Sequence, residues 1–226
     1  MFAFDPAPVP TLPVAGSTLQ IPVRRVYCIG RNYAAHAVEM GHDPDREPPF
    51  FFAKQAQNIH VGERFTYPAH SSNVHHEIEL VAVLGRGGRD IPTSEALACV
   101  YGYGVGLDMT LRDLQDSAKK MSRPWGVAKA FEHSAPCTPI VPVTQTGHPD
   151  AGAIWLKING EIRQEGDLNQ MIWKIPEMIA VLSQYFELAA GDVVMTGTPS
   201  GVGPVQRGDV LHGHVAGVGD LHLAVV

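Results

Sequence analysis

The chain has 226 residues, 45% of them hydrophobic, which is enough for one globular domain with a substantial core and no stabilising disulfides. Its formal net charge of −6 and its lack of a Lys and Arg cluster argue against nucleic acid or an anionic membrane as a partner. The cysteines Cys28, Cys99 and Cys137 are odd in number and lack metal-ligand spacing, so we expect reduced thiols.

The first 22 residues are rich in proline, a composition that favours extended chain over helix. We therefore predict an N-terminal arm over residues 1–22, followed by a single domain over residues 23–226. The arm has no basic segment followed by an apolar one, and no later segment approaches the ~18 apolar residues of a membrane span. The sequence thus predicts a cytoplasmic protein.

Local patterns beyond the arm predict short elements separated by many turns, as 23 glycines and 18 prolines suggest. Gly41 would end the first helix, Thr110 would cap the second, and Asn159-Gly160 favours a tight hairpin turn. The predicted fold class is α+β, mainly β. Its strands are 26–29, 77–84, 103–109, the hairpin 154–164, 192–196, 210–215 and 221–225, and its helices are 32–40, 110–118 and 176–186.

Two acids interrupt the start of an apolar strand. Glu77 and Glu79 are two residues apart and therefore project from the same face. Asp108 ends the next apolar segment and would supply a third oxygen ligand if the strands are neighbours. Clustered carboxylates repel unless a cation neutralises them, and this donor set suits Mg²⁺ or Mn²⁺. The alternative is that Glu77 and Glu79 form the solvated face of an edge strand.

His36 and Glu39 lie three residues apart on a predicted helix and so share a face. A carboxylate beside an imidazole orients it and raises its basicity, as a base that activates water requires. A surface polar contact between the two is the alternative. Lys129 stands among apolar residues, where a lysine either extends to water or serves a buried anion.

Other polar segments carry weaker signals. His75 and His76 lack partners at zinc-ligand spacing, which favours structural or supporting roles. The glycine-rich segment 191–203 could present backbone N–H groups and the hydroxyls of Thr196 and Thr198 to an anion, although it lacks the P-loop ending.

Several segments resemble the fumarylacetoacetate hydrolase family in content and in order. The resemblance runs from about Tyr27 to the C-terminus and leaves the proline-rich arm uncovered. Within the family, REPPFFFAK (46–54) and SRPWGVAKAFEHSAP (122–136) are most similar to bacterial fumarylpyruvate hydrolases of gentisate degradation. The matching segments are GRNYAAHAVEMG (30–41), HHEIEL (75–80), GYGVGLDMTLRDLQ (102–115), GVAKAFEHSAP (126–136), NGEIRQ (159–164) and GDVVMTGTPSGVG (191–203).

The resemblance implies a fumarylacetoacetate-hydrolase-like mixed β-sandwich roll with short helices, usually a homodimer, whose catalytic domain would be residues 23–226. It implies one Mg²⁺ or Mn²⁺ held by the acids Glu77, Glu79 and Asp108. It also implies that His36, oriented by Glu39, is the base that activates water. The amine of Lys129 would stabilise negative charge, and Gln115 and Thr198 would contact substrate oxygens.

The implied reaction is hydrolysis of a carbon–carbon bond in an acylpyruvate, a small diketo acid, with fumarylpyruvate the best candidate. Water would attack the C4 carbonyl, and fumarate and pyruvate would be released. Arg31 is expected to bind substrate, and Arg31, Lys54 and Arg123 are candidate partners for the distal carboxylate. The same site suits oxaloacetate decarboxylation, hydrolysis of another acylpyruvate or isomerisation of a hydroxydienedioate. A noncatalytic ligand-binding protein is the alternative of a different class.

Overall fold

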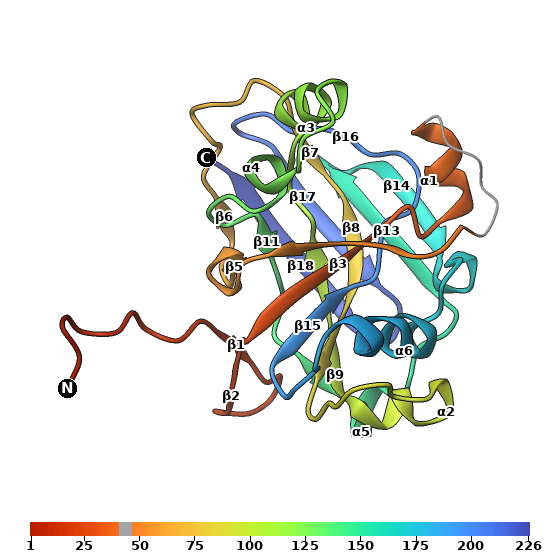
Figure 1. The fold of residues 1–226 in the computed structure, drawn as a ribbon. Helices are drawn as coiled ribbons and strands as arrows, with labels where there is room; N and C mark the ends of the chain where they lie inside the picture. Colours follow the sequence, from red (N-terminus) through yellow and green to blue (C-terminus); the bar gives the residue numbers. More distant parts are fainter. Residues whose placement is uncertain (41–46) are drawn as a thin grey trace.

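The structure, a computed structural model, describes residues 1–40 and 47–226 (Figure 1). Two large sheets form its centre. The six-stranded sheet has the order β12 (Val141–Pro142), β9 (Val100–Leu107), β8 (Ile78–Leu84), β15 (Asp192–Met195), β3 (Arg25–Gly30) and β4 (Phe50–Lys54). The five-stranded sheet has the order β14 (Glu161–Asp167), β13 (Ala153–Ile158), β17 (Val210–Val215), β18 (Gly219–Val225) and β6 (Arg64–Phe65).

Short strands and helices surround these sheets. Helices α3 and α4 lie at one end of the sheets, and α2 and α5 lie at the other (Figure 1). The small sheets pair β1 (Thr11–Pro13) with β2 (Gln20–Pro22), β7 (Val74–His76) with β10 (Thr110–Leu111) and β16 (Gly203–Pro204), and β5 (Ile59–His60) with β11 (Ala135–Pro136). The α-helices are α1 (Ala34–Glu39), α2 (Thr93–Ala96), α3 (Arg112–Lys120), α4 (Gly126–Lys129), α5 (Val143–Thr146) and α6 (Ile175–Tyr185). Single 3₁₀ turns are Ala56–Asn58, Leu97–Cys99 and Leu168–Gln170.

The core lies between the two large sheets. Leu80 and Val105 of the six-stranded sheet join Leu156 and Leu211 of the five-stranded sheet in one buried cluster. A second cluster, which includes Val81, covers the opposite face of the six-stranded sheet. Strand β8 is consequently buried at all seven positions, which explains its continuous apolar sequence. The predicted α+β, mainly β fold is therefore confirmed.

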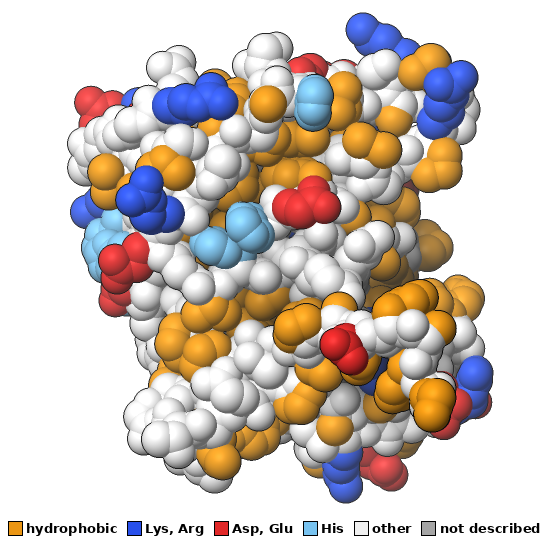
Figure 2. Space-filling view, turned by 90° about the vertical axis from the view of Figure 1, so that its left-hand side faces the viewer, with side chains coloured by type: hydrophobic (Ala, Val, Ile, Leu, Met, Phe, Trp, Pro, Cys, Tyr) orange, Lys and Arg blue, Asp and Glu red, His pale blue; other side chains and the backbone are white. Residues whose placement is uncertain are grey.

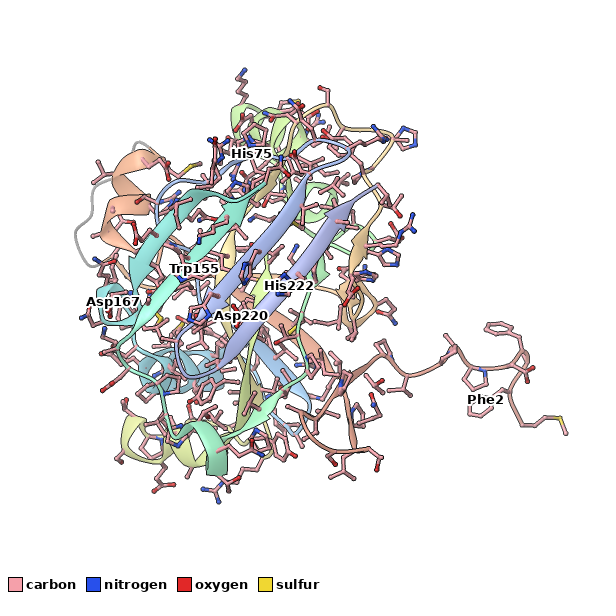
Figure 3. The ribbon with its side chains drawn as sticks, turned by 180° about the vertical axis from the view of Figure 1, so that it is seen from behind. Phe2, His75, Trp155, Asp167, Asp220 and His222 are labelled. Carbon is pink, nitrogen blue, oxygen red and sulfur yellow. The ribbon has the colours of Figure 1, made fainter. Side chains whose placement is uncertain are left out.

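The outer face of the five-stranded sheet is polar. Trp155, Asp220 and His222 project from it and face the viewer in Figure 3. His212 Nε2 and His214 Nδ1 lie 2.8 and 3.0 Å from the same Asp220 Oδ1. This sheet therefore alternates buried and solvated positions, as expected when only one face contacts the core.

Most predicted elements are present within one to three residues of their expected ends. The hairpin turn is at Asn159-Gly160, whose φ angles of 53° and 87° match the tight turn expected there. Two local predictions were wrong. Glu77 lies in the break between β7 and β8, and Thr110 is a strand residue that bonds to the Asp108 carbonyl, so it does not cap α3. Gly41, the expected helix end, lies outside the described residues.

The proline-rich segment has two parts. Residues 1–9 are exposed and extend away from the body (Figure 1). Residues 11–22 form the β1–β2 hairpin, and its Leu12 is fully buried in the second core cluster. The division of the chain at residue 22 stays a prediction.

Three further observations concern the surface charges, the helices and the cysteines. Figure 2 shows one face on which the Lys and Arg side chains stand apart from one another and form no continuous basic patch. Among the described residues, no helix is both long enough and apolar enough to cross a membrane. Cys28, Cys99 and Cys137 are buried and unbonded to one another.

Candidate metal centre and active site

The three predicted acids meet at one end of the β8–β9 pair. Antiparallel register places Glu79 opposite Gly106, and the Asp108 N–H donates to the Glu77 carbonyl at 2.9 Å. One carboxylate oxygen of each acid lies within 4.8 Å of the other two. All three side chains are buried, so the solvated-face interpretation of Glu77 and Glu79 was wrong. The cluster is an oxygen donor set that can hold one hard divalent cation.

Three buried cations contact two of these acids. Lys129 Nζ lies 2.8 Å from Glu77 Oε2 and 2.7 Å from Asp108 Oδ2. Arg112 Nη2 donates to Glu77 Oε1 at 2.6 Å, and Lys54 Nζ lies 2.8 Å from Asp108 Oδ1. Lys129 therefore serves buried anions and does not extend to water. Because burial leaves little solvent to screen these charges, loss of one member of a pair would leave its partner as an uncompensated buried charge.

The acids differ in their surroundings. Burial opposes ionisation of Glu77, but the adjacent Lys129 and Arg112 hold its pKa well below the usual range. Burial raises the pKa of Glu79 well above its ordinary value, and the neighbouring Asp108 and Glu77 raise it further. The Gly197 N–H, which donates to Glu79 Oε2 at 2.8 Å, only partly offsets this. Among the described residues, no Lys, Arg or His forms an ion pair with Glu79.

Helix α1 supplies the imidazole. His36 is buried, and its Nδ1 lies 3.1 Å from Glu39 Oε2. Glu39 also accepts the Gly201 N–H at 3.0 Å, which holds the carboxylate in place. The helix begins after Arg31, whose φ of 59° makes the sharp turn out of β3. The predicted His36–Glu39 pair is therefore formed, with its carboxylate anchored.

A narrow cleft brings most of the predicted residues together. Gln115 is buried on α3 and accepts from Arg112 Nη1 at 2.6 Å, while Thr198 follows β15 and accepts from Gln164 Nε2 at 2.8 Å. Glu39 and Asp108 lie behind the cleft surface. The predicted site residues that line it are Arg31, His36, Glu77, Glu79, Gln115, Lys129 and Thr198.

Lys54 was wrongly expected to be available to the distal end of a substrate. Its side chain is fully buried, it pairs with Asp108, and its ammonium also donates to the carbonyls of Met109 and Lys129. It does not line the cleft. Lys54 is therefore an internal counter-ion of the acid cluster.

Two further residues organise the site without a recognised signal in their local sequence. The Gln164 side chain accepts from His76 Nδ1 and the Ile78 N–H, and donates to Thr198 and the Pro199 carbonyl. The Asn32 amide donates to the carbonyls of Trp173 and Thr196 and accepts the Trp173 N–H. Gln164 is the last residue of NGEIRQ, so that segment's resemblance was the available signal.

The histidine next to the acids is held neutral. Burial and the adjacent Arg112 lower the pKa of His75 to about 4. His75 Nδ1 accepts from Arg112 Nε at 3.3 Å, and its Nε2 lies 3.0 Å from Asn73 Oδ1. His75 thus positions Arg112, which in turn contacts Glu77.

Comparison with known proteins places the chain in a family. The sequence-family model described as fumarylacetoacetate hydrolase, C-terminal, matches residues 25–226. The crystal structure of fumarylpyruvate hydrolase from Pseudomonas aeruginosa, in complex with Mn²⁺ and pyruvate, superimposes with a TM-score of 0.98 at 50% identity, covering 100% of this chain and 99% of that one.

Curated relatives of similar sequence are named for a different reaction from that of the fumarylpyruvate hydrolase. Oxaloacetate tautomerase YcgM of Escherichia coli is 43% identical over 87% of this chain and 90% of its own length. The mitochondrial oxaloacetate tautomerase FAHD1 of Mus musculus is 40% identical over 89% of this chain and 91% of its own. The match to the family model covers the whole region that contains the acid cluster and the His36–Glu39 pair. The chain therefore belongs to the fumarylacetoacetate hydrolase family and is an enzyme.

Proposed function

We propose that this enzyme hydrolyses the C3–C4 bond of an acylpyruvate and that fumarylpyruvate is its preferred substrate, giving fumarate and pyruvate. The observation that carries the proposal is the cleft in which Glu77 and Glu79 of the acid cluster lie with His36. The likeness to a fumarylpyruvate hydrolase that holds Mn²⁺ and pyruvate supports both the metal and the pyruvate end of the substrate.

The residues present fit a divalent cation. The cluster offers three hard oxygen donors, and Glu79 contacts no basic side chain among the described residues, so its carboxylate lacks a counter-charge that a cation would supply. Glu77, Glu79 and Asp108 would hold Mg²⁺ or Mn²⁺. When bound, the ion supplies a Lewis acid that stabilises negative charge on the substrate oxygens.

The other residues position water and handle the proton. Glu39 accepts the Nδ1–H of His36, which leaves Nε2 free to take a proton from water. The water oxygen bonds to C4, the C3–C4 bond breaks, and its electron pair leaves with pyruvate, whose C3 then takes up a proton. Lys129 holds a positive charge beside the acids, and Gln115 and Thr198 are placed to contact substrate oxygens.

Charge balance supports an anionic substrate. The cluster contains three carboxylates and three buried cations, Lys54, Lys129 and Arg112, so a bound divalent ion leaves it with excess positive charge. An enzyme of net charge −6 thereby presents a locally positive site. A dicarboxylic diketo acid such as fumarylpyruvate has the complementary charge.

The second candidate is tautomerisation of oxaloacetate, which the names of the 43% and 40% identical relatives favour. That reaction moves a proton at C3 and needs no water attack, so the same base would serve. Its products distinguish it, because tautomerisation leaves the carbon chain intact whereas hydrolysis yields two acids.

The test compares fumarylpyruvate, acetylpyruvate and oxaloacetate with purified protein in Mn²⁺ or Mg²⁺. We expect fumarylpyruvate to have the highest kcat/KM, and chelation to abolish turnover until metal is restored. Full activity in exhaustively metal-free protein would contradict the metal assignment. A kcat/KM for oxaloacetate above that of both acylpyruvates would contradict the substrate.

A measurement independent of turnover examines the metal site. Mn²⁺ at 100 times its Kd should raise the free energy of unfolding by about 2.7 kcal/mol, because the ion binds only the folded cluster. Glu79→Gln should lose this stabilisation, while Glu63→Gln, a change at an exposed position, should keep it. Equal stabilisation of both variants would show that Mn²⁺ binds elsewhere.

The homodimer and the cytoplasmic location stay predictions. Sedimentation would test the first, and cell fractionation would test the second.

A further inference from the structure

A second hollow adjoins the metal cleft beside β4 and α4. It has a volume of about 460 Å³, whereas the metal cleft holds about 40 Å³. Phe50, Phe52, Trp125 and Lys129 line both. A substrate that is longer than pyruvate and gripped at the acid cluster therefore has adjoining space for its distal part.

Aromatic rings form the boundary shared by the two hollows. The Phe50 and Trp125 centroids lie 5.1 Å apart at 74°, and those of Phe52 and Trp125 lie 6.1 Å apart at 61°. These edge-to-face contacts hold the rings in a fixed apolar surface. Such a surface favours a flat, conjugated chain, since a planar group can lie along it without losing rotational freedom.

The second hollow also contains a cation that is free to bind a ligand. Arg123 lines it, is exposed, and makes no ion pair within residues 1–40 and 47–226. Its backbone is fixed, because its N–H donates to the Ala118 carbonyl at 2.8 Å and Ser122 makes the turn with a φ of 51°. The other basic group there, Lys129, is already paired with Glu77 and Asp108.

Two other basic side chains near the cleft, those of Arg31 and Lys119, are less suited to the distal end, because both line the metal cleft and neither lines the larger hollow. Arg31 lies 3.9 Å from Glu47 and places its guanidinium 5.9 Å from the Phe50 ring. It borders the metal cleft but does not line the larger hollow. Together with the burial of Lys54, this leaves Arg123, among residues 1–40 and 47–226, as the guanidinium in the space that the acyl tail would enter.

We propose that this second hollow is the acyl-tail subsite and that Arg123 binds the carboxylate at the end of the tail. The subsite selects acylpyruvates whose acyl group is planar and ends in a carboxylate. The inference rests on the proposed function and deepens it, because the acid cluster can grip only the pyruvate end that all acylpyruvates share. A guanidinium is suited to a carboxylate, which it can bind through two parallel hydrogen bonds.

The test varies the tail and the guanidinium together. Fumarylpyruvate and its distal monoamide differ only in the tail charge, and Arg123→Met removes the cation at similar length. In the unaltered protein, we expect kcat/KM to favour the carboxylate by about 10- to 100-fold over the amide. In Arg123→Met that ratio should fall to about one, and Arg123→Lys should retain part of it.

Controls separate a tail contact from a general defect. Hydrolysis of acetylpyruvate, which has no tail carboxylate, should fall by a smaller factor in Arg123→Met than hydrolysis of fumarylpyruvate does. Arg89→Met, at an exposed arginine paired with Glu187 and away from both hollows, should keep the full ratio. If Arg123→Met leaves the carboxylate-to-amide ratio unaltered, the subsite proposal is overturned. If Arg123→Met also changes the sedimentation coefficient, the hollow is instead a contact between copies of the chain.

Binding measurements distinguish failure of the acyl-tail subsite from failure of the proposed hydrolysis. The same ligand pair is titrated by calorimetry into His36→Ala protein, with and without Arg123→Met, so that no turnover is required. If no acylpyruvate is hydrolysed by the unaltered protein but the affinity ratio still collapses on removal of Arg123, the proposed reaction fails and the subsite stands. If hydrolysis occurs and both ratios persist, the subsite fails alone.

Discussion

His36 lies on α1, whereas the acids lie in or beside β8 and β9, so removal of the imidazole leaves the carboxylate cluster in place. We expect His36→Ala to lower kcat for acylpyruvate hydrolysis by ~10²–10⁴-fold, the usual contribution of a general base. The Kd for Mn²⁺ should not change, because His36 is outside the cluster. Steady-state kinetics and calorimetric metal titration on the same sample measure both.

Two companion variants examine the origin of that loss. Glu39→Gln should lower kcat less than His36→Ala does, since the amide still fixes the ring position but no longer favours the Nδ1–H form. His70→Ala, a change at an exposed histidine, should leave both constants unchanged. Undiminished hydrolysis by His36→Ala would show that another group activates the water.

At the scale of single residues, predictability follows sequence distance. The His36–Glu39 pair is readable because helix periodicity places residues three apart on one face, and Glu77 reaches the same cluster as Glu79 because it is two residues away, although it lies outside β8. The network of Gln164 joins residues 88 positions apart, and Lys54, the last residue of β4, contacts Asp108 although three other strands separate β4 from β9 in the sheet. Periodicity carries no information on such contacts.

Among the elements, strand β9 shows how tertiary contacts explain local composition. Its sequence VYGYGVGL has glycine at alternate positions, although glycine weakens strands. These glycines face close neighbours, since a Cβ at Gly102 would lie 2.5 Å from the Val141 carbonyl oxygen and one at Gly106 would lie 2.6 Å from Val81 Cγ2. The glycines therefore permit the chain beyond α4 to pack directly on the strand that leads to Asp108.

We accordingly expect Gly102→Ala to lower the free energy of unfolding by about 1–3 kcal/mol, the typical effect of overpacking, because the nearest clashing atom is a backbone oxygen that cannot rotate away. Gly126→Ala is a matched control, since its added Cβ would meet nothing within 4 Å and its φ is ordinary. Urea unfolding of both variants gives the comparison. Equal stability of Gly102→Ala and the unaltered protein would mean that the packing yields at no cost.

The glycines also explain why the sequence predicted the presence of β9 but not the residues at which it begins and ends. The prediction began the strand at residue 103, whereas it begins at Val100, because the glycines interrupt the β-branched and aromatic pattern that marks strands. Helix α6, whose apolar residues recur at helical spacing, was located within one residue at each end. Elements whose stability is mainly local are thus better bounded than those whose sequence serves a distant contact.

At the scale of the whole molecule, the order of strands could not be read from local patterns. The six-stranded sheet places β15 between β8 and β3, which joins residues more than 100 positions apart. Family resemblance implied the layered architecture, and the physics of single segments did not. This pairing also sets the site, since it brings Gly197, just beyond β15, within 2.8 Å of Glu79.

The N-terminal segment allows a last prediction, about where the cooperative unit begins. Composition alone suggested residue 22, because proline disfavours helix and says nothing about burial. Leu12 has no exposed surface and belongs to the second core cluster, and the Val23 N–H donates to the Pro10 carbonyl at 2.8 Å. Deletion of residues 1–9, all of them exposed, should therefore leave the urea unfolding midpoint unchanged.

By contrast, Leu12→Ala should cost about 2–5 kcal/mol, because it removes buried methyl groups and leaves a cavity against the six-stranded sheet. Leu19→Ala, in the same hairpin but 62% exposed, is the control and should change stability by less than about 0.5 kcal/mol. Thermal and urea unfolding of the three proteins decide the matter. If the deletion destabilises the protein as much as Leu12→Ala does, the exposed residues contribute contacts and the cooperative unit begins at the first residue. If neither change has an effect, the whole arm is dispensable and the boundary at residue 22 holds.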